Sequence, residues 1–329
     1  MRRLALSLAV TVAALVVVPA AVADGPPPLV TSGGAGVATR DGAFRYVAVP
    51  DGSRRTLLER VDVSNGQVNW WIPLKGSWGT PQLVYGESTG QGLSWDGRTL
   101  ILSSLSGPYA SPSKFLVVNL KRFRVVRTIT LRGLFSFDAL SPDASRLYLI
   151  QYTHPQTGNL THYIVRGYDL HTNRLLPGRI ADRTQKSWVM KGSPLTRTWS
   201  AHGRWAYTLY ENPGGYPFIH ALDTKRGVAH CIQLPWEEDR SQAALYNLVL
   251  DARNGGRTLA VNWRSGKPWL QIAVGSWRVT EGGGGFPWIW VGAGIGGLLA
   301  LLLAGGALFL RRRRGEELDQ HPGQELGLA

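Results

Sequence analysis

The sequence feature that most constrains the fold is a short pattern that recurs five times between residues 38 and 263. Each copy has a polar turn followed by a segment in which apolar residues alternate with others, as in a half-buried strand. A unit that recurs along the chain predicts a repeat fold in which each unit packs on its neighbours. The five copies are ATRDGAFRYVAV (38–49), GLSWDGRTLILS (92–103), ALSPDASRLYLI (139–150), TWSAHGRWAYTLY (198–210) and LDARNGGRTLAVNW (250–263).

A second pattern of strand, turn and strand follows each of the first four turns. With the strand that precedes each first turn, this gives four strands per unit, at a spacing of about 47 to 60 residues between corresponding turns. Four-stranded units at this spacing are typical of propeller blades. We therefore predict an all-β fold, a five-bladed β-propeller, with six blades as the alternative if the inserts at 76–91 and 180–197 contain strands. The second patterns occupy residues 61–74, 117–131, 168–180 and 221–234.

The repeats resemble those of bacterial YVTN-type and WD-repeat-like β-propeller proteins, whose blades carry S-P-D-G-x-x-L-Y-V followed by V-x-V-x-D-x-x-T. Residues 141–149 give the fullest match, and residues 168–172 supply the second part of that motif. Ala144 stands where the usual residue is Gly. The resemblance covers roughly residues 34–280 and implies a fold but no particular activity.

The turn carboxylates of the first three copies belong to Asp41, Asp96 and Asp143. An Asp at this position of a turn accepts hydrogen bonds from nearby backbone N–H groups. We therefore interpret these residues as structural and do not count them among candidate catalytic groups.

The start of the chain is typical of an exported protein. Residues 1–23 combine Arg2 and Arg3 with an apolar stretch and an Ala-Val-Ala cleavage site, and they are predicted to be a signal peptide. Residues 24–33 are then an N-terminal linker, and the extracytoplasmic propeller occupies residues 34–281.

The end of the chain is predicted to be a single-pass membrane anchor. Residues 282–286 form a glycine-rich tether, and residues 287–310 carry no charge and are long enough to cross a bilayer core of about 30 Å. The arginines that follow place the 311–329 tail in the cytoplasm, and a G-x-x-x-G step predicts a weak homodimer through the helix. The residues assigned to the anchor are Trp288, Trp290, Gly292, Gly296, Arg311, Arg312, Arg313 and Arg314.

The chain is strongly basic, with 36 Lys and Arg against 22 Asp and Glu. Setting aside the arginines and acids at the two ends leaves a charge of about +12 on the propeller. Outside a cell this charge favours an envelope protein, an anionic cell-wall polymer or anionic headgroups as partners, and we expect no nucleic acid. The alternative is that the charge serves only solubility. No metal, phosphate or nucleophile motif occurs, so we expect no cofactor and no metal.

The innermost strands hold the candidate site. Counting back three residues from the polar residue of each turn reaches Gln91, Asp138 and Arg197 in the second, third and fourth units. A glycoside hydrolase would need two or more carboxylates there, and this position supplies one. We predict that Asp138 and Arg197 either form an ion pair or contact a polar ligand together.

Aromatic residues near the first insert are the second group of candidates. Trp70, Trp71 and Trp78 would form a platform for a sugar or a protein partner, and their alternative role is packing in the core. Taken together, these features predict a membrane-anchored, non-catalytic recognition or scaffold module for a cell-envelope partner. A small-ligand sensor and a glycan-active hydrolase with its site on the propeller axis remain the alternatives.

Overall fold

The computed structural model describes residues 29–31, 33, 35–51, 54–84, 91–105, 111–153, 162–184, 190, 192–212, 215–237 and 240–282. The predicted signal peptide (1–23), membrane anchor (287–310) and tail (311–329) lie outside the described residues. Within the described ranges, no helix has the length and apolar character needed to cross a membrane.

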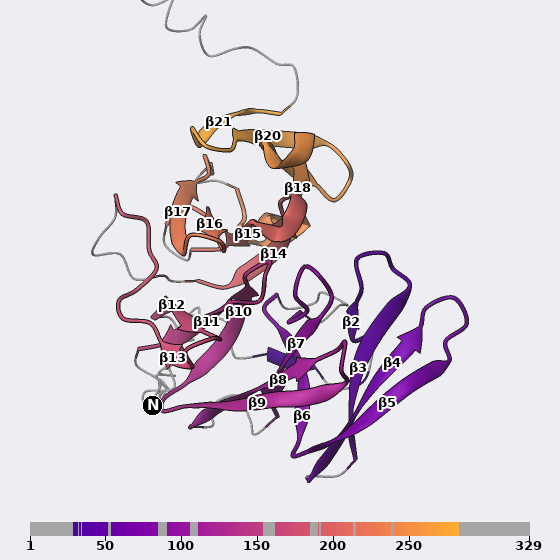
Figure 1. Cartoon of the computed structure of the whole chain (residues 1–329). Helices are drawn as coiled ribbons and strands as arrows, with labels where there is room; N and C mark the ends of the chain where they lie inside the picture. Colours follow the sequence, from indigo (N-terminus) through magenta and orange to yellow (C-terminus); the bar gives the residue numbers. More distant parts are fainter. Residues whose placement is uncertain are drawn as a thin grey trace, which may run out of the picture. The chain divides into compact units, whose positions relative to one another are not determined.

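The described residues form 21 strands in five antiparallel sheets, which follow one another in chain order (Figure 1). The first sheet contains β2 (Val37–Ala38), β3 (Phe44–Asp51), β4 (Arg55–Asp62) and β5 (Val68–Lys75). The second contains β6 (Trp78–Gln82), β7 (Thr99–Ser104), β8 (Ser113–Asn119) and β9 (Arg124–Leu131), with β1 (Leu29–Thr31) added beside β6. The third contains β10 (Phe135–Leu140), β11 (Arg146–Tyr152), β12 (Tyr163–Asp169) and β13 (Arg174–Leu175).

The last two sheets have the same order. The fourth contains β14 (Pro194–Trp199), β15 (Trp205–Tyr210), β16 (Phe218–Asp223) and β17 (Val228–Gln233). The fifth contains β18 (Leu248–Arg253), β19 (Thr258–Trp263), β20 (Pro268–Ala273) and β21 (Arg278–Glu281). Short 3-10 turns lie beside them at η2 (Ala201–Gly203), η3 (Gln242–Asn247) and η4 (Asn254–Gly256).

Four consecutive strands per repeat are therefore confirmed, and the five sheets are consistent with a β-propeller of five blades. In the described residues, the inserts at 76–91 and 180–197 hold the first strands of the second and fourth sheets and no further sheet. One difference from the sequence prediction is β1, which lies in the segment assigned to the linker. It pairs antiparallel with β6, with Leu29 opposite Gln82.

The repeated turns have the predicted chemistry. In the third sheet, the Ser141 hydroxyl donates to Asp143 Oδ1 at 2.7 Å and accepts from the backbone N–H of Arg146 at 2.9 Å. Ala144, at the position where the motif has Gly, adopts a φ of 53°. The first and second sheets repeat these bonds, so the turn carboxylates are structural. Asp41 and Asp143 consequently have pKa values below the ordinary range, because their turns donate hydrogen bonds to the ionised carboxylates.

The core lies between successive sheets. Strand residues of both faces are apolar, and four apolar clusters join the first sheet to the second, the second to the third, the third to the fourth and the fourth to the fifth. Among the described residues, no such cluster joins the fifth sheet to the first. The outward face of the fifth sheet carries an exposed ion pair between Asp251 and Arg253 at 2.6 Å.

Candidate functional site

The innermost segments of the first four sheets surround a cavity of about 260 Å³. Its wall takes residues from sheets that are far apart in sequence, as expected where propeller blades converge. Among the described residues that line it there is no Asp or Glu. The residues that line the cavity include Arg40, Gln91, Trp95, Phe137, Arg197 and Trp199.

The three aligned residues predicted from the sequence come together at this wall, with Gln91 and Arg197 in the lining and Asp138 behind them. Arg197 Nη2 lies 2.5 Å from Asp138 Oδ1, and both side chains are 1% exposed. Arg197 also donates to Gln91 Oε1 at 3.3 Å and to the carbonyl of Asp138. The ion pair is therefore present, and contact of these residues with a ligand stays a prediction.

Local strand geometry produces this pairing. The register of β10 against β11 shifts between Phe137 and Ala139, so Asp138 occupies an irregular position in its strand. The β14–β15 ladder also shifts register, between Pro194 and Thr196, and beyond that shift Arg197 stands opposite Thr208 and donates from Nε to its hydroxyl at 2.8 Å. The guanidinium is thereby held in one orientation toward the third sheet.

The Asp138 carboxylate is only half satisfied. Oδ1 pairs with Arg197, while the buried Oδ2 atom has no hydrogen-bond partner among the described residues. Because most buried polar atoms in proteins are hydrogen-bonded, this arrangement is costly in stability.

A polar row extends from Arg197 across the fourth sheet. Strand register places Thr208 opposite Arg197, His220 opposite Thr208, and Cys231 opposite His220. Burial lowers the pKa of His220 to about 4 and raises that of the Cys231 thiol above its ordinary value. Their Nδ1 and Sγ atoms are 3.8 Å apart. Both groups are neutral near pH 7, so the pair lacks the imidazolium and thiolate of an activated cysteine nucleophile.

Three tyrosines pack beside this row at the junction of the third and fourth sheets. Burial raises the pKa of Tyr152, Tyr163 and Tyr210 well above the ordinary value, so these side chains stay protonated. The Tyr163 hydroxyl donates to the Gly192 carbonyl at 3.0 Å. These groups are hydrogen-bond donors in a closed interface.

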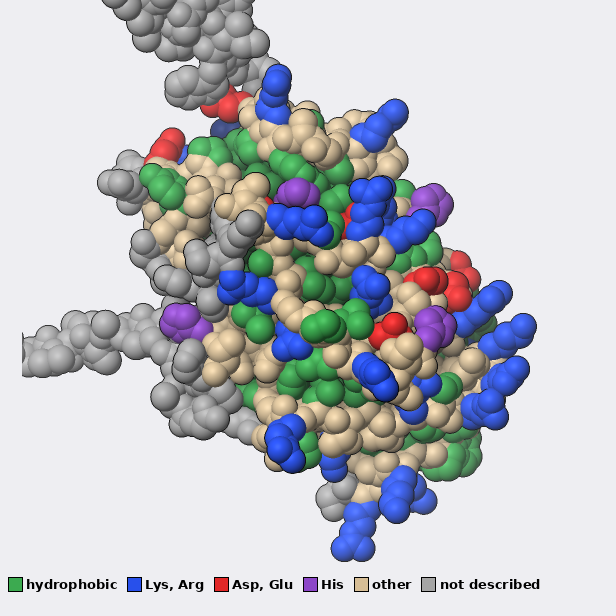
Figure 2. Space-filling view, turned by 60° about the vertical axis from the view of Figure 1, so that its left-hand side comes forward, with side chains coloured by type: hydrophobic (Ala, Val, Ile, Leu, Met, Phe, Trp, Pro, Cys, Tyr) green, Lys and Arg blue, Asp and Glu red, His purple; other side chains and the backbone are tan. Residues whose placement is uncertain are grey.

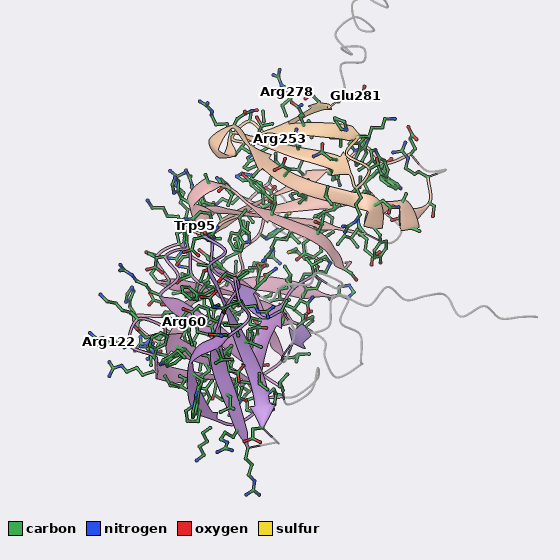
Figure 3. The ribbon with its side chains drawn as sticks, turned by 90° about the vertical axis from the view of Figure 1, so that its right-hand side faces the viewer. Arg60, Trp95, Arg122, Arg253, Arg278 and Glu281 are labelled. Carbon is green, nitrogen blue, oxygen red and sulfur yellow. The ribbon has the colours of Figure 1, made fainter. Side chains whose placement is uncertain are left out.

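At the cavity itself, the guanidinium of Arg40 lies over the indole of Trp95. Burial lowers the pKa of Arg40 to about 10, which leaves the side chain positively charged at neutral pH. Gly203 of η2 approaches the same indole so closely that a Cβ there would lie 2.5 Å from Trp95 Cε3. Trp95, labelled in Figure 3, is thus fixed between the turns of three different sheets.

Sequence reasoning missed Arg40 and Trp95 as site residues. Both occur in the repeated turns, at DG turns of the first and second copies, where a polar or aromatic residue has no distinctive spacing. The sequence signal that could have identified them as site residues is their position in two repeated turns, which meet at the axis.

The three tryptophans of the predicted platform have different environments. Trp78 is 6% exposed and donates from Nε1 to the Lys75 carbonyl at 2.7 Å, and Trp70 stacks on Phe123 with ring centroids 3.5 Å apart. Packing leaves Trp78 no surface for a partner. Trp71, on the other face of β5, is 57% exposed.

No protein-family model matches the chain, and no curated protein matches it. Among solved structures, the β-propeller domain of Cps50 (Swd1) from Myceliophteria thermophila is 12% identical, with a TM-score of 0.42 over 75% of this chain and 67% of that chain. TolB from Acinetobacter baumannii is 15% identical, with a TM-score of 0.39 over 77% of this chain and 56% of that chain. A hydrazine synthase from Kuenenia stuttgartiensis is 17% identical, with a TM-score of 0.41 over 70% of this chain and 61% of that chain.

The chain thus spans less than two thirds of the TolB and hydrazine synthase chains. The similar structures include an enzyme and a domain named only for its fold. At these identities and TM-scores the similarity indicates no activity, and the evidence about function comes from this chain's own residues.

Proposed function

We propose that this protein is a membrane-anchored, extracytoplasmic and non-catalytic recognition module for an anionic partner in the cell envelope. The observation that carries the proposal is the state of the Asp138 carboxylate, which pairs with a residue of the cavity wall. It is 1% exposed and paired with Arg197, while the cavity in front of it is lined by arginine, glutamine and aromatic residues.

This arrangement suits binding better than hydrolysis. A glycoside hydrolase positions two carboxyl groups on either side of the scissile bond, one as acid and the other as base or nucleophile. The described lining residues supply no carboxylate, and Asp138 lies behind them in its ion pair. A pocket with these groups can hold a ligand and has no means among them to cleave it.

The charge of the surface supports an anionic partner. Lys and Arg side chains are spread over the face shown in Figure 2 and outnumber the acidic side chains on it. Several, such as Arg122 and Arg278, are on outer parts of the sheets (Figure 3). A positive potential of this kind raises the rate at which anions meet the protein and weakens as salt is added.

The proposed location depends on residues 1–23 and 287–310, whose sequences are typical of a signal peptide and of a membrane anchor. Protease treatment of intact cells tests it. Cleavage within the five sheets, with the 311–329 tail protected, is the expected result, and full protection of the sheets would contradict the location.

Binding is tested with the full chain in detergent micelles, immobilised and exposed to fractionated cell-envelope extract. We expect retention of an acidic polymer or an acidic protein, and we expect that retention to fall between about 50 mM and about 500 mM salt as the Debye length shortens. Retention that ignores salt, or no retention from any envelope fraction, would contradict the proposal.

A further inference from the structure

We propose that the cavity among the first four sheets binds one anionic sugar unit, of the hexuronate type, with Arg40 as the group that holds its anion. This inference rests on the recognition function proposed above and names the chemistry of its ligand.

The charges at the cavity are not balanced within the protein. Arg197, in the cavity wall, is neutralised by Asp138 at 2.5 Å. Arg40 lies at the cavity, and no carboxylate among the described residues forms an ion pair with it. The cavity therefore carries one positive charge without a protein counter-ion. A guanidinium presents a planar fork that matches a carboxylate or phosphate through two parallel hydrogen bonds.

The Arg40 guanidinium is held in place before any ligand arrives. The Arg40 guanidinium lies over the Trp95 ring, and Trp95 is itself packed against Gly203. Stacking on an indole leaves the edge of a guanidinium, with its N–H groups, available for an anion. A cation fixed in this way loses little conformational entropy on binding, which favours affinity.

The rest of the cavity wall suits the neutral part of a sugar. The Gln91 side-chain oxygen accepts from Arg197, which orients the amide so that its NH₂ group is left as a donor at the cavity wall. Phe137 and Trp199 supply aromatic wall surface beside it. A sugar ring has hydroxyl groups and one apolar face. The donors of this wall suit the hydroxyl groups, and its aromatic rings suit the apolar face.

The size of the cavity limits the ligand to a single ring. Its volume of about 260 Å³ lies just below the range of roughly 300 to 1,000 Å³ that is usual for drug-sized ligands. An acidic monosaccharide fits this space, either free or as the terminal unit of an acidic polymer.

The test is a titration of the full chain in detergent micelles, followed by calorimetry and by tryptophan fluorescence. The probes are glucuronate, glucose and acetate. We expect glucuronate to bind with a dissociation constant near or below about 1 mM, and glucose and acetate to bind at least about tenfold more weakly. Arg40→Gln should weaken glucuronate binding at least about tenfold, because a charge-assisted bond is lost. Arg278→Gln, an exposed arginine on β21, is the matched control and should leave binding unchanged.

Thermal unfolding of Arg40→Gln shows whether the variant keeps its fold, and we expect a cooperative transition with a slightly lower midpoint, because only the stacking on Trp95 is lost. Equal affinity for glucose and glucuronate, unchanged binding by a folded Arg40→Gln protein, or no glucuronate binding at about ten times the expected constant would each overturn the inference.

The two ligand sources are separated by competition. Glucuronate that displaces a reducing-end-labelled oligoglucuronate identifies the terminal unit of a polymer as the ligand, and glucuronate binding with no oligomer binding identifies the free sugar. If wild-type protein retains an envelope component with normal salt dependence but binds no glucuronate, the inference is wrong while the recognition function stands. If it retains nothing, the recognition function itself fails.

Discussion

The interface between the third and fourth sheets differs in kind from the interface between the fourth and fifth. The second of these is filled by aliphatic and aromatic residues, among them Leu250, Leu259 and Ile272. The first also has an apolar cluster, but the buried Asp138–Arg197 ion pair joins the same two sheets. The same repeat thus builds one interface mainly from apolar and aromatic packing, with His230 against Trp277, and another that contains a buried ion pair.

Stability alone does not account for this difference. Burying two charges carries a desolvation cost that their attraction often fails to repay, and replacing such a pair with apolar residues is frequently neutral or stabilising. The fourth sheet could have used the apolar solution at both of its faces. We infer that the ion pair is kept because it fixes the wall of the cavity, so the comparison separates residues that hold the fold from residues that position the site.

The largest expected effect comes from breaking the ion pair on one side. Asp138→Ala leaves the Arg197 guanidinium buried without a counter-ion, and should lower the free energy of unfolding by about 4 kcal/mol. The double variant Asp138→Ala with Arg197→Met removes both charges and should regain most of that loss. Urea unfolding of the full chain measures the stability of Asp138→Ala, Arg197→Met and the double variant. A loss in the double variant equal to the sum of the two single losses would contradict this expectation.

The apolar interface should respond differently. Leu259 is fully buried, so Leu259→Ala removes packing and leaves a cavity, at a cost of about 3 kcal/mol. We expect that no second substitution near Leu259 restores the lost stability by removing a charge. Val126→Ala, at a residue 50% exposed, is the control and should change the unfolding free energy by less than about 0.5 kcal/mol. Similar losses for the two variants would show that the packing is not where the structure places it.

Acid should weaken the polar interface through His220. Its pKa is lowered from 6.5 to about 4 by burial, and Arg197 adds to the lowering while Asp138 and Asp182 oppose it. His220 therefore becomes protonated near pH 6.5 in the unfolded chain, but only near pH 4 in the folded chain. Stability is complete above pH 6.5 and falls as the pH drops through this window, by about 2 kcal/mol between pH 7 and pH 5. The decline should vanish in His220→Gln, and a decline that persists there would assign it to another group.

The smallest effect concerns one hydrogen bond that crosses the polar interface. The Tyr148 hydroxyl donates to the Thr224 carbonyl at 2.6 Å, from the third sheet to the fourth. Tyr148→Phe leaves that carbonyl unpaired and should cost about 1 kcal/mol. Tyr216→Phe, at a residue 50% exposed, should cost nothing measurable. Equal thermal unfolding midpoints for the two variants would remove this bond from the account.

Much of the fold could be predicted because its signals are local. Alternating apolar residues and polar turns define each strand pair within about a dozen residues, and the turn hydrogen bonds of Asp96 and Asp143 follow from their own sequence neighbours. β1 was missed because a three-residue strand after three prolines has no periodicity of its own.

The candidate site could be predicted only in part. Aligning the repeats brought Gln91, Asp138 and Arg197 together, since equivalent positions of successive blades face one axis. The contact between Arg40 and Trp95 depends on how turns from different sheets approach each other, and no local pattern encodes that approach. Trp78 shows the same limit, because its burial depends on the packing between sheets.

We expect the cavity to bind an acidic sugar and leave it intact, because no Asp or Glu is among the described residues that line it and Asp138 is held in an ion pair. The most direct measurement incubates a defined oligoglucuronate with the full chain, then records both the fraction retained and the number of reducing ends. The account predicts retention that depends on Arg40, with no new reducing ends. Reducing ends that appear with wild-type protein and disappear with Asp138→Asn would contradict it.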